Sequence, residues 1–197
     1  MLQRTYGKRA RLIRNFIEKE LKEELKEDQK KFKILSEGDL QSCVYYHLRK
    51  FIDNEEITDW HVLNKLSMKK GGAAIKIPDI VIVNMRPAGV KVYPIFLIEL
   101  KEDFTYFKSG RVEDDVKKLT KLAKEHGKQL EQTYFIYAIL DENYTPEQIE
   151  KKIVSLKSDP DDGWLFPIAV NIMGEKQFPK EMKGFMDKVE RLRKYRA

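Results

Sequence analysis

The chain has 197 residues, of which 42% are hydrophobic and 36% are charged, and its formal net charge is +6. This composition is typical of a soluble, single-domain globular protein and excludes a largely disordered chain. No apolar run approaches the ~20 residues of a membrane-spanning helix, so we expect no membrane partner. A single cysteine, Cys43, excludes a disulfide framework and a cysteine-ligated metal centre, and it favours a reducing, cytoplasmic setting. The positive charge favours a polyanionic partner such as nucleic acid.

Residues 1–33 predict a long helix, because apolar side chains recur every four residues from Ile13 to Leu25. The first half of this helix is basic and includes Lys8 and Arg9. Two interpretations remain open at this point. The helix packs its apolar stripe on the core with its charges in solvent, or its basic half contacts a phosphate backbone.

A second helix begins after Ser36, which has the character of an N-cap with Asp39 three residues later. The next predicted elements are a strand at 60–68, strands at 77–85 and 90–101 joined by a turn at 86–89, a helix at 111–127 and a strand at 133–140. A helix capped by Thr145, a strand near 164–172 and a closing helix at 179–195 follow.

Continuous apolar strands alternating with amphipathic helices predict an α/β fold, with a mixed central sheet flanked by helices. We expect one domain, residues 1–197. It consists of an N-terminal helical arm (1–33), a core (36–140) and a C-terminal α/β extension (141–197).

The two central strands carry charges at their ends. Asp79 opens the first strand, and Glu99 and Lys101 close the second. Symmetric pairing about the turn would place Asp79 opposite residue 96. Pro94 lacks an N–H to donate, so we expect a β-bulge near it that moves Asp79 towards Glu99. Side chains alternate along a strand, so Glu99 and Lys101 share one face.

Two carboxylates in a small space repel each other unless a cation lies between them. Oxygen ligands of this kind favour Mg²⁺ or Mn²⁺, and a nearby lysine can position or deprotonate a water, or neutralise charge on a phosphate. This combination of residues is suited to metal-assisted hydrolysis of a phosphodiester. The alternative is structural: Asp79 caps a turn, and Glu99 pairs with Lys101.

Pro78-Asp79 followed by Glu99-Leu100-Lys101 resembles the motif of the PD-(D/E)xK nuclease superfamily, which has the restriction-endonuclease-like fold. The family core runs helix, three strands, helix, strand, and the resemblance covers residues 36–140. It implies that Asp79, Glu99 and the Leu100 carbonyl hold a catalytic Mg²⁺ or Mn²⁺. It also implies that Lys101 acts on the water or the scissile phosphate.

Many members of the family carry a further acidic residue on the first core helix. Glu37 is our choice for that residue, with Asp39 and Gln41 as alternatives. The segment Asp114–Leu119 resembles a pattern that follows the site in some restriction-like members. Its Lys118 either contacts a phosphate or is an exposed helix lysine near two aspartates.

Aromatic and basic residues alternate after the site, where Lys108 and Arg111 would contact nucleic acid together with Lys8 and Arg9 of the first helix. The expected function is therefore a metal-dependent endodeoxyribonuclease, restriction-like or structure-selective, which by resemblance acts on DNA as a homodimer. The alternative is a nucleic-acid-binding or assembly module that retains the nuclease fold without its chemistry. The three histidines lack metal-ligand spacing and are expected to be packing or surface residues.

Overall fold

The computed structural model describes residues 2–31, 33–34, 36–64, 69–70, 73–74, 78–85, 92–101, 110–126, 130–139, 145–156 and 165–171. Its helices are α1 (Leu2–Asn15), the π-helix η1 (Phe16–Glu20), α2 (Leu21–Lys30), α3 (Glu37–Asn54), α5 (Arg111–His126) and α6 (Pro146–Ser155). Its strands are β1 (Trp60–Asn64), β2 (Lys69–Lys70), β3 (Ala73–Ala74), β4 (Ile80–Met85), β5 (Val92–Lys101), β6 (Gln132–Ile139) and β7 (Leu165–Asn171).

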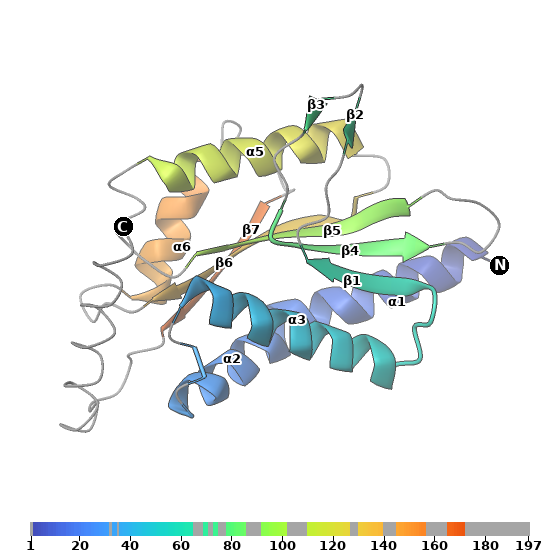
Figure 1. Cartoon of the computed structure of the whole chain (residues 1–197), viewed down its shortest axis with the longest axis horizontal. Helices are drawn as coiled ribbons and strands as arrows, with labels where there is room; N and C mark the ends of the chain where they lie inside the picture. The colour runs from blue at the N-terminus through green and yellow to red at the C-terminus, as the bar shows by residue number, and fades with distance from the viewer. Residues whose placement is uncertain are drawn as a thin grey trace.

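A five-stranded sheet in the order β1–β4–β5–β6–β7 lies at the centre of the molecule. The pairs β1–β4 and β4–β5 are antiparallel, whereas the pairs β5–β6 and β6–β7 are parallel. Figure 1 shows α1, α2 and α3 on one side of the sheet and α5 and α6 on the other. Both faces are therefore buried, which explains the continuous apolar runs of β4 and β5. The predicted α/β class with a mixed sheet is confirmed. A small hairpin of β2 and β3 was not predicted.

The N-terminal helix packs its apolar stripe against the sheet. Ile13, Ile17, Leu21 and Leu25 are each at most 1% exposed. The predicted helix is confirmed as three consecutive segments that end at Lys30, with the π-helical turn η1 in the middle. Burial of the stripe supports the amphipathic interpretation of this helix.

Side-chain caps fix the starts of two helices as expected. The Ser36 hydroxyl accepts a hydrogen bond from the Asp39 backbone N–H at 3.1 Å and begins α3. Thr145 and Gln148 form a reciprocal capping box at the start of α6. Ser36 fixes the residue at which α3 begins, and it thereby places Glu37 in the first turn of that helix.

Replacing Ser36 with alanine is expected to lower the free energy of unfolding by about 1 kcal/mol, because the Asp39 N–H loses its acceptor. The matched control is Ser42→Ala, an exposed serine of the same helix that bonds back to the Gly38 carbonyl. It should cost nothing, since alanine has the higher helix propensity. Urea denaturation of both variants measures the difference, and equal stabilities would contradict the capping role.

Several expected features lie outside the described residues: the turn at 86–89, the segment with Lys108, and the closing helix at 179–195. Within the part of the chain that is described, no helix is long and apolar enough to cross a membrane.

Candidate active site

The register of β4 and β5 brings Asp79 next to Glu99. Val83 lies opposite Pro94 but Ile82 lies opposite Phe96, so Ile95 is an extra residue in β5. Ile95 and Phe96 consequently belong to the same core cluster, which breaks the strand alternation. The expected bulge at Pro94 is confirmed. Ile80 pairs with Ile98, and the residues one step further along the two strands are Asp79 and Glu99.

Two hydrogen bonds fix Asp79 at the start of β4. Its Oδ2 accepts from the Leu100 backbone N–H at 2.9 Å. Its own carbonyl oxygen accepts from Gln41 Nε2, also at 2.9 Å, which ties the strand to α3. Gln41 thus holds the backbone of Asp79, whereas the Leu100 N–H holds one oxygen of its carboxylate.

Glu99 is the most buried charged residue of the site, at 3% exposure. Lys118 Nζ donates to its Oε2 at 2.7 Å, and Lys101 Nζ lies 3.7 Å from its Oε1. Burial, followed by the charges of Asp79 and Asp115, raises the pKa of Glu99 to about 7, although Lys118 acts in the opposite direction. This carboxylate therefore carries a proton part of the time near neutral pH.

Lys101 lies at the centre of three carboxylates from three elements. Its Nζ is 3.3 Å from Asp115 of α5, 3.5 Å from Glu37 of α3 and 3.7 Å from Glu99 of β5. Burial alone would lower the pKa of Lys101, but the surrounding carboxylates outweigh it and raise the pKa. The lysine is thus an ammonium ion at neutral pH, which suits neutralisation of charge better than removal of a proton.

Glu37, Asp79, Glu99, Lys101, Asp115 and Lys118 form what we call the carboxylate–lysine cluster. With every member ionised, its four carboxylates and two ammonium groups carry a formal charge of −2, which one divalent cation would balance. No group of three or more His, Cys, Asp or Glu side chains among the described residues is already arranged around a metal position. The expected set contains only two carboxylates and a carbonyl, and Mg²⁺ retains several waters, so the donor chemistry fits.

The three candidates on α3 have different partners in the structure. Glu37 reaches Lys101, whereas Asp39 accepts from the Ser36 hydroxyl at 2.8 Å and Gln41 bonds the Asp79 backbone. Burial, then the charges of Asp79 and Asp115, raises the pKa of Glu37 against the effect of Lys101. Among these three side chains, Glu37 is the one placed beside Lys101.

Asp115 belongs to the cluster but was not expected there. It precedes Lys118 by three residues, so both side chains lie on the same side of α5. That spacing is visible in the sequence. However, only the packing of α5 against β5 shows that this side faces Glu99 and Lys101. Lys118 is itself 10% exposed in its side chain, so its interpretation as an exposed helix lysine is wrong.

The structure does not bring Lys8 and Arg9 to the cluster. Arg9 pairs with Asp59. The Asp59 carbonyl accepts a hydrogen bond from the backbone N–H of Met85, the last residue of β4. Met85 is about 20 Å along the strand from Asp79. Lys8 is exposed on the same helix. Figure 1 shows the N-terminus of α1 and the first turns of α3 and α5 at opposite ends of the sheet.

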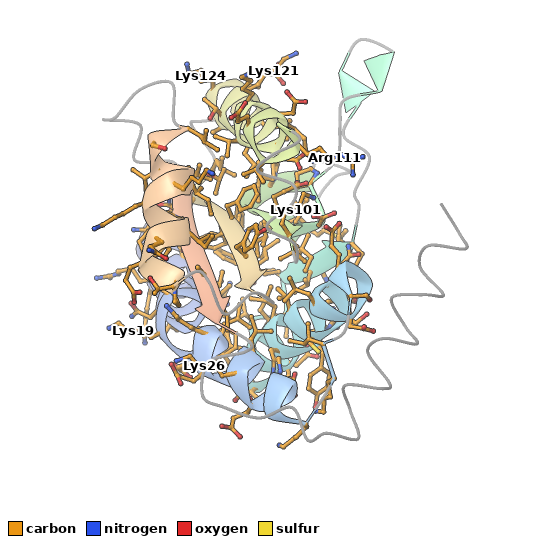
Figure 2. All side chains as sticks on the ribbon, turned by 90° about the vertical axis from the view of Figure 1, so that its left-hand side faces the viewer. Lys19, Lys26, Lys101, Arg111, Lys121 and Lys124 are labelled. Atoms are coloured by element: carbon orange, nitrogen blue, oxygen red, sulfur yellow. The ribbon has the colours of Figure 1, made fainter. Side chains whose placement is uncertain are left out.

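Arg111 is exposed at the start of α5, and Lys108 lies outside the described residues. In Figure 2, Lys101 lies between the helix layers, whereas Lys121 and Lys124 project outward from α5. Burial and pairing therefore distinguish the lysines of the cluster from the solvated lysines of the same region.

Comparison with known proteins gives no family: no family model matches the chain, and neither curated proteins nor solved structures yield a match.

Proposed function

We propose that this protein is a metal-dependent endonuclease that hydrolyses phosphodiester bonds of DNA, with a site of the PD-(D/E)xK type. The observation that carries the proposal is the register of β4 and β5, which brings Asp79 beside Glu99 and leaves Lys101 among carboxylates from three elements. A purely structural pair of Glu99 and Lys101 does not account for a cluster of four carboxylates with excess negative charge.

The fold is compatible with this proposal. A helix (α3), three strands of the main sheet (β1, β4, β5), a helix (α5) and a strand (β6) follow one another in the order expected for the restriction-endonuclease-like core. The cluster lies where the start of β4 meets the end of β5, with the first turn of α3 and the second turn of α5 beside it.

Asp79, Glu99 and the Leu100 carbonyl would hold Mg²⁺ or Mn²⁺, which when bound polarises the phosphate and lowers the pKa of a coordinated water. The remaining chemistry belongs to side chains of the chain. The Lys101 ammonium, which lies among carboxylates from three elements, would neutralise the charge that develops on the phosphate oxygens. Gln41 and the Leu100 N–H would hold Asp79 in place during the reaction.

Arg111, at the start of α5, and Lys108 would contact the phosphate backbone next to the site. Lys8 and Arg9 would contact it only for a substrate that also extends along β4, because they lie at the other end of that strand. A homodimer, with one cluster for each strand of a duplex, is part of the proposal.

Nicking of supercoiled plasmid tests the proposal, because a closed circle has no end and is cut only by an endonuclease. Purified protein with Mg²⁺ or Mn²⁺ should convert the plasmid to the open circle, whereas EDTA should prevent this conversion. Asp79→Asn should remove cleavage and preserve salt-dependent DNA binding. Cleavage by this variant at the rate of the unmodified protein would refute the site. Salt-dependent binding without cleavage of duplex or branched DNA would favour the non-catalytic binding module.

A further inference from the structure

Lys118 is held in an unusual position for a helix lysine. Its Nζ lies 2.7 Å from Glu99 Oε2, closer than the contacts of Lys101 described above, and 3.7 Å from Asp115 Oδ1. Its side chain is 10% exposed, whereas Lys121, one turn further along α5, is exposed. Burying an ammonium group costs free energy, and the attraction of the neighbouring carboxylates must offset most of that cost.

Glu99 is also one of the two carboxylates proposed to hold the divalent cation. Lys118 and the cation would therefore compete for the negative charge of the same carboxylate, and two positive charges bound to one carboxylate repel each other. Lysine is suited to such an exchange, because its charge lies at the end of a flexible four-carbon chain that can turn towards solvent while α5 stays in place.

We propose that Lys118 is an internal counter-ion of the metal-free site: its ammonium neutralises Glu99 and Asp115 until a divalent cation displaces it towards solvent. The proposal rests on the proposed function and adds a regulatory property to it. Lys118 lowers the affinity of the site for the cation and stabilises the fold when the cation is absent. It thus differs from Lys101, whose Nζ contacts carboxylates from α3, β5 and α5 together.

The first test measures Mn²⁺ affinity by calorimetry without nucleic acid, at one pH for every variant. Lys118→Met should bind Mn²⁺ at least tenfold more tightly, because the cluster then gains one negative charge. Lys118→Arg keeps the positive charge and should bind no more tightly than the unmodified protein. Lys121→Met, the matched control on the same helix, should remain within about twofold, since an exposed charge is screened.

A second test needs no substitution. Acetylation of individual lysines by an amine-reactive reagent is followed by mass spectrometry with EDTA or with saturating Mg²⁺. Lys118 should react slowly in EDTA and several-fold faster with Mg²⁺, whereas the rate at Lys121 should not change. This measurement keeps the proposal falsifiable if Lys118→Met does not fold.

The two proposals can fail separately. If the unmodified protein nicks plasmid with Mg²⁺ but Lys118→Met does not bind Mn²⁺ more tightly, or Lys118 remains protected when Mg²⁺ is bound, the counter-ion role is wrong and the nuclease stands. If neither the unmodified protein nor Lys118→Met binds Mn²⁺ at all, the cation site itself is wrong, and the counter-ion role is refuted with it.

Discussion

Replacing Glu99 with glutamine should reduce metal-dependent cleavage by on the order of 10³-fold or more, because a lost metal ligand removes several kcal/mol of transition-state stabilisation. Glutamine has nearly the same shape and keeps an oxygen that can accept from Lys118, so the variant should still fold, with reduced stability. Initial rates of plasmid nicking at saturating Mg²⁺ measure the loss, and far-UV circular dichroism checks the fold.

The matched control is Glu131→Gln. Glu131 is a half-buried glutamate that pairs with Arg14, and it precedes Gln132, whose partner in β5 is Phe96 rather than Glu99. Cleavage by this variant should stay within about twofold of the unmodified rate, because a partly exposed ion pair contributes only ~0.2–1 kcal/mol to stability. Cleavage by Glu99→Gln at the rate of Glu131→Gln would show that the nuclease assignment of the cluster is mistaken.

Much of the fold was predictable because its signals are local. The apolar stripe of the first helix, the caps at Ser36 and Thr145, and the apolar runs of β4 and β5 each depend on residues close in the sequence. The bulge was predictable for the same reason: Pro94 has no N–H, so the ladder is interrupted at its position whatever the surrounding fold.

Only those residues of the candidate site that lie on or next to the paired strands β4 and β5 were predictable. Register and bulge together place Asp79 by Glu99, and alternation places Lys101 on the same face of β5. The choice among Glu37, Asp39 and Gln41 depends on the angle at which α3 meets the sheet, which no sequence period encodes. Membership of Asp115 depends in the same way on the packing of α5.

A second buried ionic cluster was not predictable at all. Asp28 of α2 and His47 of α3 are 19 residues apart, and His47 was expected to be an ordinary packing or surface residue. Both are at most 6% exposed. His47 is therefore a buried residue, in agreement with the expectation of a packing histidine. However, nothing in its position on the helix indicated that it would contact Asp28.

This cluster joins the two helices on the far side of the sheet from α5. His47 Nε2 donates to Asp28 Oδ2 and Lys33 Nζ donates to Asp28 Oδ1, both at 2.7 Å. Burial alone would raise the pKa of Asp28, but the hydrogen bonds from Lys33, His47 and Cys43 outweigh it and hold that pKa below its ordinary value. Asp28 therefore contributes to stability as an ionised carboxylate.

Asp28→Asn should lower the free energy of unfolding at neutral pH by about 1.5–3 kcal/mol, because the hydrogen bonds that the buried carboxylate accepts from His47 and Lys33 are lost or weakened. Since the pKa of Asp28 is lowered in the folded protein, its contribution is complete above the unfolded value and is lost as the pH falls through the folded value. The difference between the variant and the unmodified protein should therefore be constant above about pH 5 and shrink below about pH 4.

Urea denaturation from neutral pH down to about pH 3 measures this dependence. Asp53→Asn serves as the control, because Asp53 is an exposed aspartate of α3, the helix that carries His47, in an i,i+4 pair with Arg49, and it should change stability by at most ~0.5 kcal/mol. His47 lies ten residues, about 15 Å, along α3 from Glu37. Asp28→Asn should thus leave plasmid nicking by the folded protein unchanged below its unfolding temperature. A destabilisation that persisted at full size to pH 3 would show that Asp28 acts through packing rather than through its charge.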